Sequence, residues 1–521
     1  MKNLCLSFVR SSKAALRRPV VCVLATLFLG IAIASLLTAI FGVPYPTFPD
    51  EFAYLLSSDT FASGRLNNPA HPLWHHFETF HQIQQPSYAS KYPPGQGLML
   101  AIGQSLGGHP IIGSILSIGF SMAALAWMLT GWLPKKYNGL IVLFVVCHPA
   151  LHWAWGQSYW GGALAMAGSS LMLGALVRLT KDFQIKYAII AAMGTVLLAN
   201  SRPFEGAVLT AVVGLALLTK LITKPQWKAG PFLARVILPG FIVLGFGAAW
   251  TMTYNHAVTG DALKMPYMIH EKTYGWTPFF LWQSPGEKPF HRHPDMEVGY
   301  VKDKEAVEAA FESTRDVVSI KTAATVRVLF FFCGGSLVIA FLSLPWLLKR
   351  QKYQLALAMA IPVFFAGMAT PWEWPHYCAP AAPLVFLILL ASWIEIWKLT
   401  RAAPKARVLV LIGIVAAQIY WTTAVVNKQN SKKERVYASK RAELTRQLEE
   451  SPGRDLVVIR YPVPSKGQWV YNTANIDSSE IVWAREISDQ GRQELIKHFN
   501  DRKIWLLDTT AESPKLERLD Q

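Results

Sequence analysis

Residues 20–56 read VVCVLATLFLGIAIASLLTAIFGVPYPTFPDEFAYLL: an uninterrupted apolar run, a proline-rich turn and two adjacent acids, Asp50 and Glu51. The apolar run has the length of a helix that crosses a hydrocarbon core of roughly 30 Å. It is too long for the core of a signal peptide and lacks a small-residue cleavage site, so we expect it to be retained as an anchor. Paired carboxylates directly after an anchor are unusual, because a membrane surface gains nothing from them.

Apolar blocks of similar length recur through the chain, which has 521 residues and is 52% hydrophobic but only 16% charged. Blocks of this length predict transmembrane helices. We expect about eleven of them, at residues 20–41, 110–132, 139–153, 159–177, 187–199, 206–219, 232–254, 328–348, 353–368, 379–397 and 408–425. Composition and run length therefore predict an all-α polytopic membrane protein.

Basic residues mark one face of the membrane. They precede the first predicted span and recur in every second connection after it, among them Lys135, Arg178, Lys220, Lys349 and Lys398. By the positive-inside rule this face is cytoplasmic. Residues 1–19 then lie in the cytoplasm, and the membrane domain of residues 20–427 carries two large external loops, 42–109 and 256–327. An odd number of spans puts the tail, 428–521, outside, an arrangement that suits the inner membrane of a bacterium.

The formal net charge of +17 follows from these basic helix ends. No interleaved run of aromatic and basic residues accompanies it, so a nucleic-acid partner is not expected. The five cysteines have no CxxC spacing, and most lie in or beside apolar blocks. That pattern predicts neither a disulfide framework nor a zinc site built on cysteine. The sequence thus indicates the lipid bilayer as the main surroundings of the protein.

Histidines gather in the first external loop, in HPLWHHFETFH at residues 71–81. His71 and His75 are four residues apart, a spacing that would bring two imidazoles together on one face of a helix and suits zinc. His76 and His81 lie in the same stretch, but the sequence offers no firm third ligand. We therefore expect these histidines to lie in an exposed loop.

The tail has the pattern of a small α/β domain. DLVVIRY at residues 455–461 and KIWLLDT at residues 503–509 read as strands, and GRQELIKHFND at residues 491–501 has helical periodicity. The tail contains no glycine-rich phosphate loop. We expect it to support the membrane domain rather than to hold an active site of its own.

A second unusual element follows the acids, in SKYPPGQGLMLAIGQSLGGHP at residues 90–110. A Pro-Pro step opens a short amphipathic helix, too short to span a membrane and suited to lying along its surface. An anchor, an Asp-Glu pair, a Pro-Pro interfacial helix and a second span, in this order, resemble the GT-C superfamily. Its members are polytopic glycosyltransferases that use lipid-phosphate-linked sugars, among them bacterial aminoarabinose transferases and protein O-mannosyltransferases. The resemblance covers the order of elements over about the first 430 residues.

The resemblance implies that Asp50 occupies the position of the catalytic acidic residue. An acceptor hydroxyl has a pKa far above neutral and must lose its proton as it attacks the anomeric carbon. A carboxylate within hydrogen-bond reach can act as the general base of such an inverting transfer. Glu51 would assist, orient the acceptor or hold a cation. The family is divided over metal use, so the need for a divalent cation stays open.

The leaving group, a polyprenyl phosphate, needs cations and hydrogen-bond donors at the external surface. Arg202, in NSRPFEG, lies where a proline breaks a helix, and its planar guanidinium suits bidentate phosphate contact. Lys91, ahead of the Pro-Pro step, is a second candidate. His376 and Tyr377, in PWEWPHYCAP, resemble the family's aromatic segment before a late span. A snorkelling arginine and an ordinary aromatic belt would produce the same pattern, and these alternatives stay open.

Contacts to the sugar or the acceptor are expected from Tyr159 and Trp160, in the aromatic turn HWAWGQSYWGG, and from Glu205. The function that unites these residues is a membrane glycosyltransferase that moves a sugar from a polyprenyl-phosphate donor to a lipid, glycan or protein acceptor. A transporter or lipid flippase is an alternative, although ionisable residues in mid-span or inverted repeats are not evident. A non-catalytic envelope scaffold is another, and it leaves the Asp-Glu pair unexplained.

Overall fold

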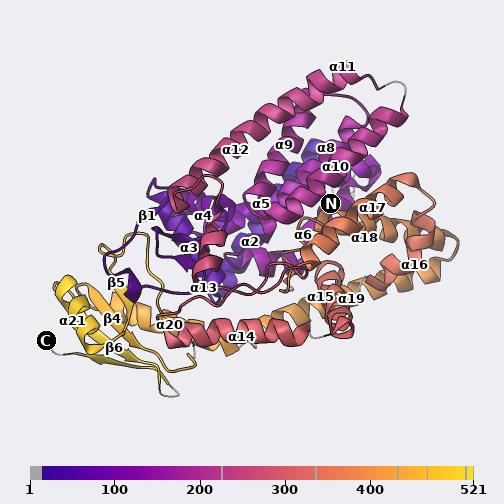
Figure 1. Cartoon of the computed structure of the whole chain (residues 1–521). Coiled ribbons are helices and arrows are strands. Elements are labelled where there is room, and N and C mark those ends of the chain that lie inside the picture. The colour runs from indigo at the N-terminus through magenta and orange to yellow at the C-terminus, as the bar shows by residue number, and fades with distance from the viewer. Residues whose placement is uncertain are drawn as a thin grey trace. The chain divides into compact units, whose positions relative to one another are not determined.

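The computed structural model describes residues 15–224, 227–311, 313–334, 337–372, 374–430, 433–465, 467–510 and 513–519. The chain divides into two compact units, each made of three segments (Figure 1). The first unit comprises Met1–Val43, Ser114–Trp250 and Ser319–Gln429. The second comprises Pro44–Gly113, Thr251–Val318 and Asn430–Gln521.

The first unit consists of long apolar helices. Seven helices among the described residues are long and apolar enough to cross a membrane: Pro19–Phe41, Ile111–Trp132, Gly162–Leu179, Pro203–Thr223, Ala229–Thr259, Ala382–Ala402 and Pro404–Ala424. A bent pair, Lys135–Val146 and Pro149–Gly156, would make an eighth. The chain is therefore a multi-pass membrane protein, as predicted, while the number of about eleven spans stays a prediction.

The helices of this unit have the following bounds. They are α2 (Pro19–Phe41), α5 (Ile111–Trp132), α6 (Asn138–Val146), α7 (Pro149–Leu151), α8 (Gly162–Leu179), α9 (Ile185–Ala199), α10 (Pro203–Thr223), α11 (Ala229–Phe232), α12 (Leu238–Thr259), α15 (Thr314–Cys333), α16 (Leu337–Leu347), α17 (Gln351–Met368), α18 (Ala382–Leu399) and α19 (Pro404–Asn430). The helices α12, α15 and α19 continue into the second unit.

Two of the predicted spans are not single long helices: one is bent and one is short. The predicted span 139–153 is broken between α6 and α7 with a bend of 47°, because Pro149 has no amide hydrogen and disfavours a helical residue before it. The predicted span 187–199 is the 15-residue helix α9, which packs tightly against α8 (Figure 1). A Cβ atom on Gly194 would lie 2.5 Å from the carbonyl oxygen of Gly168, so only glycine permits this approach.

The second unit mixes short helices with two small sheets. Its elements are α3 (Pro49–Ala62), β1 (Asn68–Pro69), η1 (Trp74–His76), β2 (Gln82–Ile83), β3 (Ser87–Ser90), α4 (Pro94–Gly107), α13 (Pro266–Tyr274), α14 (Pro294–Ala310), α20 (Lys433–Glu449), β4 (Asp455–Arg460), β5 (Ile481–Arg485), α21 (Asp489–His498), β6 (Lys503–Asp508) and β7 (Lys515–Arg518). The helix α4 is the one that the Pro-Pro step predicts.

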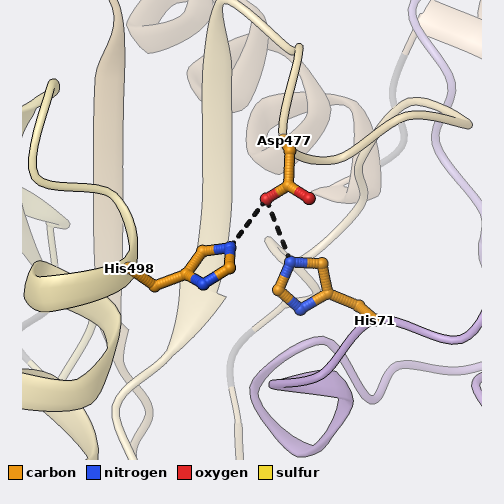
Figure 2. A group of neighbouring side chains, drawn as sticks. All are labelled: His71, Asp477 and His498. Carbon is orange, nitrogen blue, oxygen red and sulfur yellow. Dashed lines mark hydrogen bonds and ion pairs between the residues drawn. The ribbon is translucent and has the colours of Figure 1, made fainter.

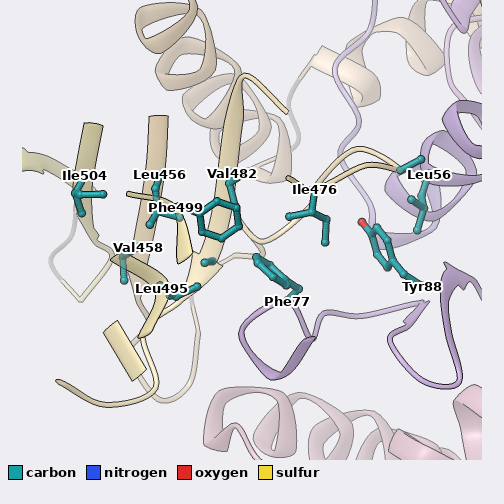
Figure 3. Packing of buried hydrophobic residues seen from close by; sticks show 12 residues of the cluster. Leu56, Phe77, Tyr88, Leu456, Val458, Ile476, Val482, Leu495, Phe499 and Ile504 are labelled. Atoms are coloured by element: carbon teal, nitrogen blue, oxygen red, sulfur yellow. The ribbon is translucent and has the colours of Figure 1, made fainter. Parts of the chain in front are cut away.

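The tail domain is built on a four-stranded sheet of order β5-β4-β6-β7, in which β4 is parallel to β5 and β6, and β6 is antiparallel to β7. Successive side chains of a strand point to opposite faces. Leu456 and Val458 of β4 pack in one apolar cluster with Leu495 of α21 (Figure 3). Val457 packs in another with Leu444 of α20. A helix therefore covers each face, and the predicted small α/β tail is confirmed.

The pair of acids does not end the anchor. Asp50 and Glu51 open the separate helix α3, which packs against α4. A Cβ atom on Gly97 of α4 would lie 2.4 Å from the Cβ atom of Ser57 on α3, so the two helices approach closely at this glycine. The proline-rich turn after the anchor thus leads into a second helix that carries the acids in its first turn.

Candidate functional site

Asp50 lies at the N-terminus of α3, where two side chains from the following loop contact its carboxylate. The hydroxyl of Tyr92 donates to Asp50 Oδ1 at 2.5 Å. His81 Nδ1 lies 3.4 Å from Asp50 Oδ2 and 3.0 Å from the hydroxyl oxygen of Tyr92. The side chain of Asp50 is 22% exposed, so solvent and small molecules can reach it.

The hydrogens of this group can be placed by elimination. An ionised carboxylate only accepts hydrogen bonds, so the single hydrogen of Tyr92 goes to Asp50. His81 Nδ1 must then be protonated, because it faces the oxygen of Tyr92 and the second oxygen of Asp50. Burial raises the pKa of Asp50, but the neighbouring His81, Tyr92 and Lys91 outweigh burial and hold that pKa well below its usual range. Asp50 is therefore a carboxylate at neutral pH.

His81 adopts a backbone conformation that side chains rarely take, with φ at +64°. Histidine tolerates this left-handed region better than most residues, but at a cost in conformational energy. The carbonyl of His81 accepts a hydrogen bond from the amide of Lys91 at 3.2 Å, which holds the turn. The chain thus keeps an unfavourable conformation at the residue whose ring faces Asp50.

A second charged group lies beside this one. Lys91 Nζ is 3.4 Å from Glu271 Oε1, and both side chains are less than one fifth exposed. Glu271 also contacts His270 Nδ1 at 3.1 Å, and the rings of His270 and His81 are 6.0 Å apart. Burial raises the pKa of Glu271, but Lys91 and His270 outweigh it and lower the pKa to about 2. Lys91 is therefore paired with an ionised carboxylate from the second loop.

The buried imidazole of His270 predicts a pH dependence. Burial and the charge of Lys91 lower its pKa from 6.5 to about 4, although Glu271 opposes them; Tyr300 and His81 also face its ring. Below pH 6.5 His270 binds a proton in the unfolded chain but stays neutral in the folded chain until the pH approaches 4. Stability should therefore fall on acidification, by about 3 kcal/mol from this residue once the pH reaches the folded pKa.

The measurement is the melting temperature in detergent between pH 7 and pH 4, for the wild type and for His270→Gln. The variant keeps a polar side chain but cannot titrate, so its melting temperature should fall less over this range. Equal slopes for the two proteins would contradict the assignment.

Glu51 has a different environment from Asp50. It is 4% exposed, and its Oε2 accepts the amide hydrogens of Thr47 at 2.8 Å and Phe48 at 3.3 Å. These contacts close the N-terminus of α3 in the manner of a capping box. Glu51 thus holds the helix start that positions Asp50, and its expected catalytic part stays a prediction.

The first unit brings together another set of predicted residues. Arg202 is the residue before α10, whose start is set by a proline. Its guanidinium carbon lies 4.3 Å from the ring centre of Tyr377. The ring of His376 lies 4.3 Å from that of Trp160 and 4.8 Å from that of Tyr377, and Trp160 lies 5.6 Å from Trp374. Residues from three separate stretches of sequence therefore form one aromatic and cationic cluster.

The residues predicted to contact the sugar or the acceptor are buried or half-buried. Tyr159 is 2% exposed and Glu205 is 4% exposed, whereas Trp160 is half-buried. Glu205 lies in the first turn of α10, where a negative charge is favourable. The charges of Glu205 and Arg202 interact. The roles of Tyr159, Trp160 and Glu205 towards a sugar or acceptor stay predictions.

Several residues of both groups were not predicted from the sequence. Tyr92, His81, His270 and Glu271 surround Asp50 or Lys91. His81 stood out only as one of the loop histidines, and the sequence placed none of the four at this site. Lys321 lies in α15, and its Nζ donates to the carbonyl oxygen of Thr370 at 2.7 Å. The helix α15 starts at Thr314, before the apolar run that predicts a span, so hydropathy gave no sign of this lysine.

The histidines of the first loop are not exposed as expected. His71 is 7% exposed and His76 is fully buried, because the tail domain covers this stretch. His71 Nε2 and His498 Nε2 both contact Asp477 Oδ1, at 3.1 and 2.9 Å (Figure 2). The i, i+4 spacing does not form a helical pair, since η1 has only three residues.

The fold of this chain, with long apolar helices in one unit and mixed elements in the other, is similar to that of solved membrane proteins. The chain is similar to ArnT from Cupriavidus metallidurans bound to undecaprenyl phosphate, with a TM-score of 0.50, 12% identity and coverage of 92% of each chain. ArnT is a GT-C glycosyltransferase. The resemblance in fold that the sequence predicts is therefore confirmed.

An oligosaccharyltransferase from Archaeoglobus fulgidus in the apo form is also similar, with a TM-score of 0.48 and 13% identity. The match covers 85% of this chain and 62% of the archaeal protein, so the chain spans about three fifths of that protein's length. No family model and no curated protein sequence matches the chain.

Proposed function

We propose that this protein is a membrane glycosyltransferase that moves a sugar from a polyprenyl-phosphate donor to an acceptor, with inversion at the anomeric carbon. The observation that carries the proposal is Asp50. It is a partly exposed carboxylate whose orientation is fixed by Tyr92 and His81. The GT-C type of fold supports it.

Asp50 acts as the general base in this proposal. The acceptor hydroxyl binds within hydrogen-bond distance of the carboxylate and transfers its proton as the bond to the anomeric carbon forms. Because the pKa of Asp50 is low, the carboxylate is ionised in every enzyme molecule at neutral pH. Tyr92 contacts Oδ1 and His81 contacts Oδ2, so both hold the carboxylate in one orientation, and each oxygen keeps a further lone pair for the acceptor. Glu51 caps the helix that holds Asp50 in place.

Arg202 contacts the phosphate of the donor in this proposal. Stacking on Tyr377 holds its guanidinium in one plane, and a planar fork matches two phosphate oxygens. The imidazole of His376 is a further donor in the same cluster. Lys91 is paired with Glu271, and we assign it to the group around Asp50 rather than to free phosphate binding. No divalent cation is invoked.

The membrane arrangement completes the proposal. About eleven spans, with the N-terminus in the cytoplasm and the tail outside, follow from the alternation of basic connections. The acceptor would then be a lipid, glycan or protein on the external face of a bacterial inner membrane. The tail domain has a supporting role, because it covers the loop that carries His71 and His76.

The test is incubation of the purified protein with a panel of polyprenyl-phosphate sugars and candidate acceptors, with released polyprenyl phosphate as the readout. Acceptor-dependent release from at least one donor is expected. Binding of the donor without release under every combination would favour a flippase instead. Absence of both binding and release would favour a scaffold.

Replacing Arg202 with lysine should weaken use of the donor. Lysine keeps the charge but loses the planar fork and the stacking on Tyr377. Loss of one charged hydrogen bond costs about 1.5–3 kcal/mol, which is roughly 10- to 150-fold in the KM for the donor. The measurement is the rate of transfer against donor concentration.

The matched control is Arg178→Lys. Arg178 also stacks on a ring, that of Trp127 at 4.0 Å, and bonds to the carbonyl oxygen of Gly174. This variant makes the same chemical change elsewhere in the first unit and should leave the KM for the donor unchanged. If Arg202→Lys leaves that KM unchanged too, Arg202 is a snorkelling residue at a helix end.

A further inference from the structure

Two histidines from η1 and a glutamate from α21 form a group that is separate from the residues proposed for catalysis. His75 and His76 lie on η1, and Glu494 lies on α21. Each offers one nitrogen or oxygen atom, and these three atoms lie within 4.8 Å of one another. Two imidazoles and one carboxylate are a set of ligands typical of zinc.

The hydrogen bonds of His76 leave one of its nitrogens available. His76 Nδ1 lies 2.7 Å from the carbonyl oxygen of Arg485. A carbonyl only accepts, so Nδ1 carries the hydrogen and Nε2 carries a lone pair. Nε2 is buried and has no hydrogen-bond partner among the described residues. A buried acceptor without a partner costs free energy and needs an explanation.

The neighbouring glycine shows which helix lies beside this edge of the His76 ring. A Cβ atom on Gly491 would lie 3.3 Å from His76 Nε2, so the nitrogen lies directly against α21. Gly491 and Glu494 are three residues apart and share one face of that helix. Nε2 of His76 is therefore directed towards the face of α21 that carries the carboxylate.

An apolar cluster holds the two elements together. Phe77 follows His76 in the chain, and Leu495 follows Glu494; both belong to the buried cluster that includes Phe499 (Figure 3). The backbone on either side of the histidines and the glutamate is thus fixed by packing. Ligands of one tetrahedral zinc ion lie roughly 3.4 Å apart, so small rotations of the side chains suffice to close the group.

A second group of similar composition comprises His71, Asp477 and His498 (Figure 2). Unlike His76, His71 has a hydrogen-bond partner at each of its ring nitrogens. His71 Nδ1 accepts the amide hydrogen of Leu73 at 2.9 Å. The ring hydrogen is therefore on Nε2, the atom that faces Asp477. Zinc binding through Nε2 would require the hydrogen to move to Nδ1, where the amide hydrogen of Leu73 opposes it. This group is explained by hydrogen bonds alone.

We propose that His75, His76 and Glu494 bind one zinc ion, with water as the remaining ligand. The ion links the first external loop to the tail domain. The hydrogen bond from His76 Nδ1 to a backbone carbonyl is the outer contact that metal-bound histidines usually make.

The test is binding of Zn²⁺ and Co²⁺ to the full-length protein and to two variants, Glu494→Gln and Asp477→Asn. Both substitutions remove one negative charge from an exposed side chain of the same domain, so folding is expected to be preserved. Zinc is measured by competition with a chromophoric chelator. The visible absorption of bound Co²⁺ reports the ligands. A third variant, His75→Ala, removes a ligand from the half-buried side of the group.

We expect the wild type and Asp477→Asn to bind one equivalent of metal with the same affinity. Loss of an outer contact to a metal ligand lowers metal affinity roughly 10- to 100-fold. Glu494→Gln and His75→Ala remove a ligand itself, so their affinity should fall by more than this. Zinc should also raise the melting temperature of the wild type but not that of Glu494→Gln. The proposal is overturned if the wild type binds no zinc, or if Asp477→Asn loses as much affinity as Glu494→Gln.

Discussion

Sugar transfer by Asp50→Asn is expected to be roughly 10²–10⁴-fold slower than transfer by the wild type. Asparagine has the same shape, and its oxygen can still accept the hydrogen of Tyr92 at the position of Oδ1. It cannot take up the proton of the acceptor hydroxyl. The variant therefore separates proton transfer from packing and from the contacts that hold the site.

The matched control for this prediction is Glu51→Gln, one residue away in the same turn. It removes the same charge, but a glutamine oxygen can still accept the amide hydrogens of Thr47 and Phe48 that Glu51 accepts. We expect it to slow transfer far less than Asp50→Asn. Donor binding and protein yield are measured for both variants, so that loss of rate is not confused with loss of folded protein.

The low pKa of Asp50 also predicts the pH profile of the wild type. The pKa of Asp50 lies well below its usual range because His81, Tyr92 and Lys91 outweigh the effect of burial. Wild-type activity should therefore show no loss from protonation of Asp50 at any mildly acidic pH. Transfer by Asp50→Asn at the wild-type rate would mean that Asp50 does not act as the base, and the proposed mechanism would be wrong.

Removing the carboxylate of Asp295 is expected to destabilise the second unit by about 3–5 kcal/mol. Asp295 Oδ1 lies 2.7 Å from Arg485 Nη1, with side-chain exposures of 5% and 2%. Arg485 also donates to the carbonyl oxygen of Glu78 and stacks on Tyr461. In Asp295→Ala the guanidinium would remain buried without its carboxylate, and that uncompensated charge accounts for the large effect.

The measurement is hydrogen exchange of the amides in β4 and β5, whose protection reports the opening of the tail sheet. Glu297→Ala is the matched control, because it removes an acid from the same helix whose partner Lys288 is exposed. A surface pair of this kind contributes little to stability. The double variant Asp295→Leu with Arg485→Met should be less unstable than Asp295→Ala, since it removes both charges. Equal protection in Asp295→Ala and Glu297→Ala would contradict the prediction.

The apolar helices could be predicted because a transmembrane helix satisfies its hydrogen bonds within one segment. Run length therefore located α2, α5 and α8 closely, and the short strand-like runs at residues 455–461 and 503–509 located the strands β4 and β6. The break after α6 could have been read from Pro149. The strand β5 was missed, although IVWAR at residues 481–485 is rich in residues that favour strands.

The candidate site was predictable only in part. Asp50 and Arg202 stand out in the sequence because each is a charge in an unexpected place. Their partners do not, since Tyr92 is 42 positions from Asp50 and Glu271 is 180 positions from Lys91. The histidine stretch was predicted to lie in an exposed loop, and this was wrong for His71 and His76, because residues about 400 positions away in the tail domain cover them.

The sequence by itself determined that this protein is a polytopic membrane protein with a small α/β tail. These properties follow from local patterns, because hydropathy signals act over one or a few turns. Only the tertiary structure decided that one nitrogen of His76 is buried without a hydrogen-bond partner, that Asp50 is held by Tyr92 and His81, and that Arg485 is buried against Asp295. Such contacts join residues far apart in the chain, and their protonation and charge depend on burial, which no stretch of sequence specifies alone.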